Sequence, residues 1–160
     1  MQRDFARRLV SFALSLFFTF SVCANEQTAV DTPSKIRQAL AALEGSYRWR
    51  ADLKFYLYSE QQQIESIISA LPPKVAVSEL IGCLDDRSTS MSTFEGKRVN
   101  VGLVCYTALT QLAYYEHTNS PGSRSTHWPG LISPRASSRE MQRAKAAWKK
   151  AEAAKLLILL

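Results

Sequence analysis

Two stretches of sequence decide the fold: Val75-Ala-Val-Ser-Glu-Leu-Ile-Gly-Cys-Leu-Asp-Asp86 and Val101-Gly-Leu-Val-Cys-Tyr-Thr-Ala-Leu-Thr-Gln-Leu-Ala-Tyr-Tyr115. In the first, apolar residues recur at i, i+3, i+4 and i+7, which is the pattern of one buried helix face. The second contains no charged residue, and a helix that is apolar nearly all round is a buried one. The sequence therefore predicts two facing helices, with the second at the centre of the fold.

Each of these helices carries one cysteine, Cys83 in the first and Cys105 in the second. An even number of cysteines in an oxidising compartment favours a disulfide, and the third cysteine of the chain falls in the leader described next. Closing the loop between Cys83 and Cys105 would contribute about 3 kcal/mol in the chain-entropy model. Two free buried thiols are the alternative. A redox-active pair would be expected to show the short Cys-x-x-Cys spacing.

The first 24 residues have the three parts of a secretory signal peptide. A basic start precedes an uncharged apolar run, Leu9–Val22, and Val22-Cys23-Ala24 provides a cleavage site. The apolar run is about 14 residues long, which is shorter than the roughly 20 needed to span a bilayer. We therefore expect a signal peptide over 1–24, one domain over 25–160, and a location in the periplasm or outside the cell. A retained anchor and lipid attachment at Cys23 are the alternatives.

The charge of the chain is mildly basic, with a formal value of +6, of which the leader carries +2. An exported protein rarely meets nucleic acid, so no nucleic-acid partner is predicted. An anionic envelope surface is the more natural counterpart of any basic face.

Helical patterns continue on both sides of the central pair. Thr32-Pro33 is a helix-start signal, and a helical repeat beginning after Ser59 ends at Pro72-Pro73. Ser137 and Glu140 form a capping box that opens a C-terminal helix rich in lysine and arginine. The polar connection 87–100 is expected to hold a small β-hairpin with Gly96 in its turn.

Two segments are less regular. Tyr47–Tyr58 alternates apolar and polar residues like a strand, yet no partner of similar length is evident, so a helix is favoured over a strand. His117–Pro134 is rich in Pro, Gly, Ser and Thr and is expected to be a long ordered loop.

The segment 72–115 resembles a HEAT-type helical repeat. Its helix ends in a corner, Leu84-Asp85-Asp86, and its second helix contains the pair Ala108-Leu109. The insertion 87–100 and the cysteines depart from that pattern. The resemblance implies stacked helical hairpins and a role in binding proteins. The expected fold class is therefore mainly α, a compact HEAT-like helical domain with one disulfide and a small β-hairpin insertion.

Residues for catalysis are sparse. The acid–histidine residues are Asp85, Asp86, Glu116, His117 and His127, but they lack the spacing of a metal site. The sequence also lacks a Gly-x-Ser-x-Gly elbow and a glycine-rich phosphate loop. No catalytic residue, metal ligand or cofactor is assigned. A cell-envelope hydrolase or metal-binding protein that uses this cluster is kept as an alternative.

The favoured function is a non-catalytic exported protein that binds another protein, of the inhibitor, immunity or accessory type. Its candidate binding surface lies outside the two central helices, at Phe94, Arg98, Tyr114, Tyr115 and Trp128. A further alternative is association with the envelope surface through the basic C-terminal helix.

Overall fold

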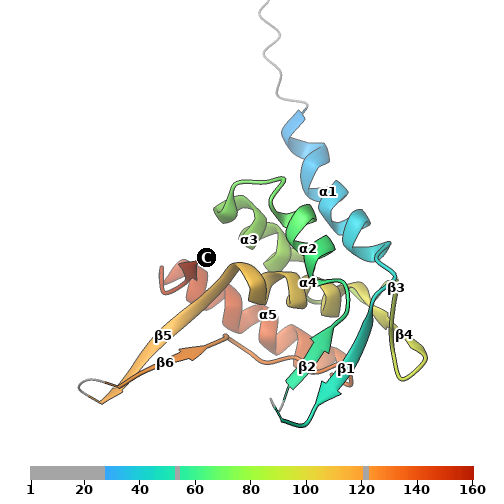
Figure 1. Cartoon of the computed structure of the whole chain (residues 1–160). Coiled ribbons are helices and arrows are strands. Elements are labelled where there is room, and N and C mark those ends of the chain that lie inside the picture. Colours follow the sequence, from blue (N-terminus) through green and yellow to red (C-terminus); the bar gives the residue numbers. More distant parts are fainter. Residues whose placement is uncertain (1–27, 53–54, 121–122) are drawn as a thin grey trace, which may run out of the picture.

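The chain folds into helices and two β-sheets, so its architecture is mixed α/β (Figure 1). The computed structural model describes residues 28–52, 55–120 and 123–160, with side chains over 35–52, 55–115 and 127–160. The predicted signal peptide over 1–24, including Cys23, lies outside the described residues. Strands form both ahead of and behind the central helices, and the mainly α prediction is therefore wrong.

The elements follow one another in a mixed order. The helices are α1 (Thr28–Ala41), α2 (Gln61–Ile68), α3 (Pro73–Cys83), α4 (Val101–Leu112) and α5 (Ser138–Ala153). The strands are β1 (Ser46–Arg50), β2 (Phe55–Tyr58), β3 (Thr89–Phe94), β4 (Lys97–Asn100), β5 (Ala113–Ser120), β6 (Ser123–His127) and β7 (Ile158–Leu159).

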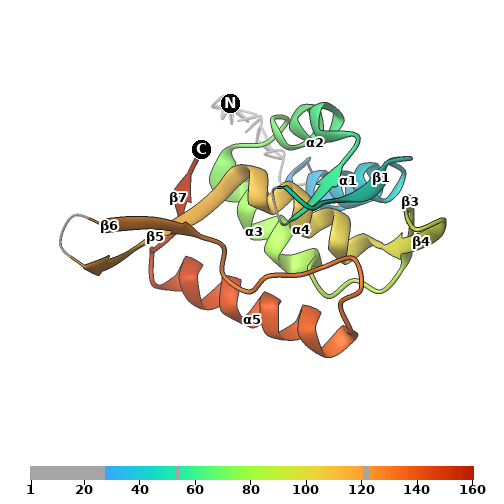
Figure 2. The ribbon, with the colours of Figure 1, turned by 60° about the horizontal axis from the view of Figure 1, so that its bottom comes forward.

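Helix α4 is the centre of the core, as its uncharged sequence predicts. Nine of its residues are buried, and helices α1, α2, α3 and α5 surround it (Figure 2). The Asn100 side chain caps its start by accepting a hydrogen bond of 3.1 Å from the Leu103 amide. Gly102 lies so close to the carbonyl group of Leu84 that an added methyl would overlap it. This contact seats the end of α3 on the first turn of α4.

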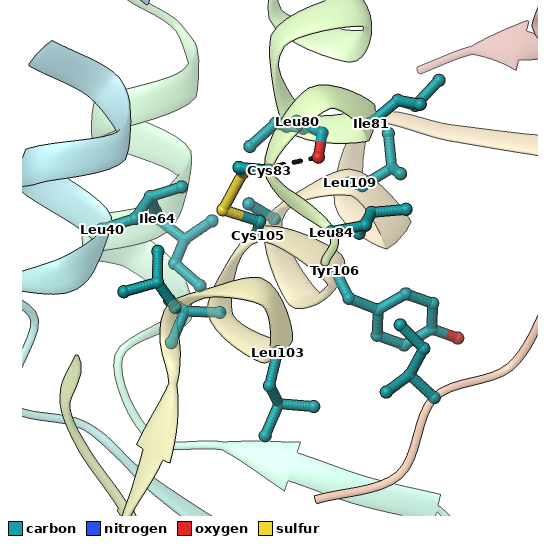
Figure 3. Close-up of a cluster of buried hydrophobic side chains, with 14 of the residues drawn as sticks. Leu40, Ile64, Leu80, Ile81, Cys83, Leu84, Leu103, Cys105, Tyr106 and Leu109 are labelled. Atoms are coloured by element: carbon teal, nitrogen blue, oxygen red, sulfur yellow. Dashed lines mark hydrogen bonds between the residues drawn. A yellow bond between two sulfur atoms is a disulfide. The ribbon is translucent and has the colours of Figure 1, made fainter. Parts of the chain in front are cut away.

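The predicted disulfide joins α3 to α4. Cys83 and Cys105 are bonded, with their Cα atoms 6.2 Å apart, and both are buried among aliphatic side chains of α1–α4 (Figure 3). The prediction of a Cys83–Cys105 disulfide is confirmed.

The four-stranded sheet has the order β2-β1-β3-β4 and overturns the helix favoured for Tyr47–Tyr58. That segment is a hairpin, in which Tyr47 pairs with Tyr58 and Arg50 with Phe55. The strand partner lies within the segment itself, and β1 gains a second, parallel partner in β3. The Ser59 hydroxyl accepts a hydrogen bond from the Ser46 amide at 2.9 Å and so does not cap α2, whose N-cap residue is Glu60.

The β3–β4 hairpin forms as predicted. Glu95 and Gly96 both adopt positive φ, 50° and 75°, which is the backbone of the two-residue turns that match strand twist. Phe94 pairs with Lys97 and Thr93 with Arg98. The hairpin lies between Cys83 and Cys105 in the chain, so the disulfide closes the loop that carries it.

A second sheet, of order β6-β5-β7, replaces the first half of the loop expected over His117–Pro134. Strands β5 and β6 form an antiparallel hairpin that extends from the body in both views (Figures 1 and 2). The C-terminal tail docks as β7 on β5, and the Leu160 amide donates to the Leu112 carbonyl at 2.9 Å.

Helix α5 lies along α3 and α4 and follows the predicted capping box at Ser137 and Glu140, which is formed. Its apolar face is buried as expected, with Trp148 fully enclosed.

This arrangement excludes the HEAT-type repeat. Helices α3 and α4 do form a packed pair, but a β-hairpin joins them and strands flank the pair on both sides. The acidic corner also has another role. Asp85 pairs with Lys145 of α5 at 2.6 Å, and Asp86 pairs with Arg37 of α1 at 2.5 Å. The corner therefore ties α3 to the first and last helices rather than to a following repeat.

Candidate functional site

The five residues proposed for the binding surface separate into two groups. Phe94 and Arg98 lie on the β3–β4 hairpin, which leads into the start of α4. Tyr114, Tyr115 and Trp128 lie beyond its end, where the Trp128 indole donates to the Thr110 carbonyl at 3.3 Å. Because the twelve residues of α4 span about 18 Å, the two groups do not form one continuous surface.

Phe94 of the first group lines a hollow between β1 and the β3–β4 turn, which we call the aromatic notch. It is lined by residues 46–49 of β1 and 93–96 of the hairpin, and encloses about 420 Å³. The notch exists because β1 and β3 pair only at Ser46–Thr93 and Tyr47–Phe94. Beyond Tyr47, within the described part of the sheet, the edge of β1 that faces β3 has no strand beside it.

Aromatic rings from three strands gather at this notch. Trp49 and Tyr56 are cross-strand partners with ring centroids 4.9 Å apart, and Tyr56 meets Phe94 edge to face at 5.3 Å and 88°. The guanidinium of Arg135 lies 5.5 Å over the Phe94 ring and also pairs with Glu95 at 2.5 Å. The rings hold one another in place, while Trp49 remains 52% exposed.

Below the exposed rings, two buried tyrosines fix the sheet to the helices. Tyr47 and Tyr58 stack at 4.8 Å, and the Tyr47 hydroxyl lies 2.8 Å from the Thr107 hydroxyl of α4. Ser92 donates to the Leu43 carbonyl, so its oxygen receives the Tyr58 proton at 2.7 Å. Burial raises the pKa of both tyrosines above the ordinary value. They are therefore neutral groups that hold the sheet against the helices.

The opposite face of the same sheet is basic. Side chains alternate along a strand, so Arg48 and Arg50 point away from Tyr47 and Trp49. The register places Arg98 on this face as well, through its pairing with Thr93. We call Arg48, Arg50 and Arg98 the arginine face.

The three arginines differ in their charge partners. Arg50 is held by Asp52 through two bonds of 2.9 and 2.7 Å. Arg48 and Arg98 are exposed, and neither is in an ion pair among the described residues.

Apolar side chains share the arginine face. Phe55 is 46% exposed and Met91 39% exposed. The sheet therefore presents aromatic and aliphatic groups together with cations that the fold itself does not neutralise.

The acid–histidine residues are not brought together. Asp85 and Asp86 lie where α3 ends, beside the first turn of α4, and His127 lies at the end of the other sheet, stacked on Tyr115 at 5.7 Å. Glu116 and His117 lie on β5, at positions whose side chains are not described. Among the described residues, three or more metal-binding side chains do not cluster anywhere.

Asp86 is structural. Burial acts to raise the pKa of its carboxyl, but hydrogen bonds from the Ser88 amide and hydroxyl, together with the Arg37 guanidinium, outweigh it and hold the pKa below the ordinary value. The carboxylate closes the end of α3, and its basic partner is Arg37 of α1. A shallow second pocket of about 390 Å³ adjoins this ion pair, lined by Arg37, Gln38, Ala41, Ser88 and Val101.

The basic C-terminal helix is exposed along one side. Arg139, Arg143, Lys149 and Lys150 face solvent, whereas Lys145 is engaged by Asp85. Leu160 is largely exposed even though its backbone is docked. In the described ranges, no single helix has the length and apolarity of a membrane span, and α2 and α3 reach them together only across a 117° bend.

Comparisons with known proteins give no relative. No family model, curated protein or solved structure matches the chain.

Sequence reasoning missed most of the side-chain cluster around Phe94 at the notch. Trp49, Tyr56 and Arg135 were not among the candidates, because Tyr47–Tyr58 was expected to be a helix. The signal was present in Tyr47-Arg48-Trp49-Arg50, where aromatic residues alternate with arginines, an order that as a strand places the two kinds on opposite faces.

Proposed function

We propose that this protein is a non-catalytic binding protein that recognises another protein through the aromatic notch and the arginine face. The observation that carries the proposal is Trp49, an indole half exposed to solvent that packs on the Tyr56 ring of β2, which Phe94 of β3 contacts in turn. Tryptophan, tyrosine and arginine are the residues most enriched in interface hot spots.

Pre-organisation favours this surface for binding. The Tyr56 ring contacts both Trp49 and Phe94, and Arg135 packs over Phe94. Side chains that are already ordered lose less conformational entropy when a partner arrives. The cluster is therefore suited to receive an anchoring side chain without rearrangement.

The ring geometry favours a protein partner over a flat ligand. The Trp49 and Tyr56 rings are tilted by 59°, and those of Tyr56 and Phe94 by 88°. Successive bases stack on ring faces that they can meet one after another, whereas tilted rings form a pocket with walls. Such walls fit a single apolar side chain.

The lining of the notch favours binding over catalysis. Its carboxylate, Glu95, is engaged by Arg135. The hydroxyl groups of Ser46 and Thr93 lie in the lining without a histidine or second carboxylate in it that would activate them. This is why the proposal names a binding protein of the inhibitor, immunity or accessory type.

The test compares two exposed tryptophans. The full chain is immobilised and exposed to an extract of the producing cells, as the wild type, as Trp49→Ala and as Trp128→Ala. A hot-spot tryptophan contributes about 2 kcal/mol or more, so Trp49→Ala should lower retention of the partner by at least roughly thirtyfold. Trp128→Ala serves as the matched control at the other end of α4 and should retain it. Retention that survives Trp49→Ala, or no retained protein at all, would refute the proposal.

A further inference from the structure

The free edge of β1 is the feature that identifies the partner more closely. Strand β3 pairs with β1 only as far as Tyr47 and Phe94, and then turns away through Glu95 and Gly96. Residues 48–50 of β1 continue past that point, bonded to β2 on their other side. Arg48 and Trp49 line the aromatic notch along this edge.

We infer that an extended, acidic segment of the partner protein adds to this edge as a short strand, placing an apolar side chain in the notch between two acidic ones. The inference rests on the proposed function and names the chemistry of its ligand. A peptide that adds a strand to a sheet gains affinity from main-chain hydrogen bonds and specificity from alternate side chains.

The alternation of β1 sets the order of side chains in the ligand. Trp49 points into the notch, whereas Arg48 and Arg50 on either side of it point to the arginine face. Residues directly beside one another on adjacent strands point to the same face. The ligand residue beside Trp49 must therefore be apolar, and its two neighbours must lie on the arginine face.

The charge of that face makes those neighbours acidic. Arg48 and Arg98 have no ion pair among the described residues, and Arg50 is already matched by Asp52. Glu95, the carboxylate in the lining of the notch, is bonded to Arg135, and Asp52 is bonded to Arg50. A carboxylate of the ligand would thus meet unmatched guanidinium groups, with which it forms paired hydrogen bonds.

The test uses a displayed library of random heptapeptides selected on the full chain, followed by synthesis of the enriched peptides. The expected motif is an apolar or aromatic residue flanked on both sides by Asp or Glu. Fluorescence anisotropy should show at least about tenfold weaker binding after Arg48→Glu. The same reversal at Lys150→Glu, on the far end of α5, should leave binding unchanged.

Changes in the peptide complete the test without altering the protein. N-methylation of the backbone amides beside the apolar residue should abolish binding, because it removes strand pairing. A peptide with lysines in place of the acids should bind Arg48→Glu better than the wild type. Selection of basic or uncharged peptides, no selection, or binding that tolerates Arg48→Glu or N-methylation would overturn the inference. If a partner from extract still depends on Trp49 in that case, the inference fails and the proposed function stands.

Discussion

Reduction of the Cys83–Cys105 disulfide should destabilise the protein by about 3 kcal/mol. The two cysteines are 22 residues apart in sequence, and a cross-link that closes a loop of this length removes about 11 cal/mol/K from the entropy of the unfolded chain. At 25 °C this amounts to roughly 3 kcal/mol. Domains of this size are usually stable by about 5–15 kcal/mol, so the reduced protein should remain folded.

Urea denaturation of oxidised and reduced wild type measures this cross-link apart from packing, because both forms keep the two sulfur atoms. Reduction should lower the midpoint and raise the slope, since the reduced unfolded chain exposes more surface. The variant Cys83→Ala/Cys105→Ala should fall below the reduced protein, because both side chains are buried and truncation leaves cavities.

Two results would refute this reasoning. If the free energies of unfolding of the oxidised and reduced protein differ by less than about 1 kcal/mol, the cross-link does not act mainly on the unfolded chain. Two free thiols in unreduced, denatured protein would show that the disulfide is not formed in solution.

Three further changes test the fold through stability. Tyr58→Phe removes the hydroxyl that donates to the buried Ser92 of β3 and should lower the free energy of unfolding, measured by urea titration, by about 1–2 kcal/mol. The Tyr56 hydroxyl has no hydrogen bond among the described residues, so Tyr56→Phe should cost little in the same titration. Gly102→Ala would drive a methyl into the backbone that ends α3 and should destabilise the protein by about 1–3 kcal/mol. Gly82→Ala, with open space around its Cβ, should instead stabilise it by about 0.5–1 kcal/mol. Equal effects of the two variants would contradict the close contact between Gly102 and the end of α3. Because the pKa of Asp86 is lowered in the folded state, its contribution is complete above the unfolded value of about 3.9 and is lost as the pH falls through the folded value. Asp86→Asn should therefore be less stable than wild type at pH 7 but lose less stability between pH 5 and pH 2, and parallel pH profiles would refute the assignment.

The helices could be predicted from sequence because their signals are local. Buried faces repeat within one stretch, as in α4, and caps such as Ser137 with Glu140 lie a few residues apart. The cysteine pairing was also accessible, because only one pair remains once the predicted leader is set aside.

The strands could not be placed in the same way because a strand is stable only with its partners. A strand over Tyr47–Tyr58 would need a partner of similar length elsewhere in the chain, but the two halves of this segment pair with each other. The β5–β6 hairpin was concealed by turn-forming and polar residues that resemble a loop. The acidic corner at Asp85 and Asp86 fitted a repeat motif, but its meaning depends on Arg37 and Lys145, which are about 50 and 60 residues away.

The same error hid the candidate site. As a helix, residues 47–58 would place Trp49 and Tyr56 on one face but two turns apart, about 10 Å along the axis. As a hairpin, they are sorted onto two faces, and Trp49 and Tyr56 become direct neighbours. Only Phe94 and Arg98 were identified in advance, because the β3–β4 hairpin was the one strand pair that the turn residues revealed.

The disulfide and the notch are connected by the order of elements along the chain. The loop that Cys83–Cys105 closes contains the whole β3–β4 hairpin, and thus one wall of the notch. The other wall, β1, is tied to the same helix α4 by the Tyr47–Thr107 hydrogen bond. Both walls are therefore held by α4: the β3–β4 hairpin through covalent bonds and β1 through the buried Tyr47 hydroxyl. The disulfide at the centre of the fold thus bears on the notch as well as on stability, because it closes the loop that carries one wall and joins the helix that holds the other.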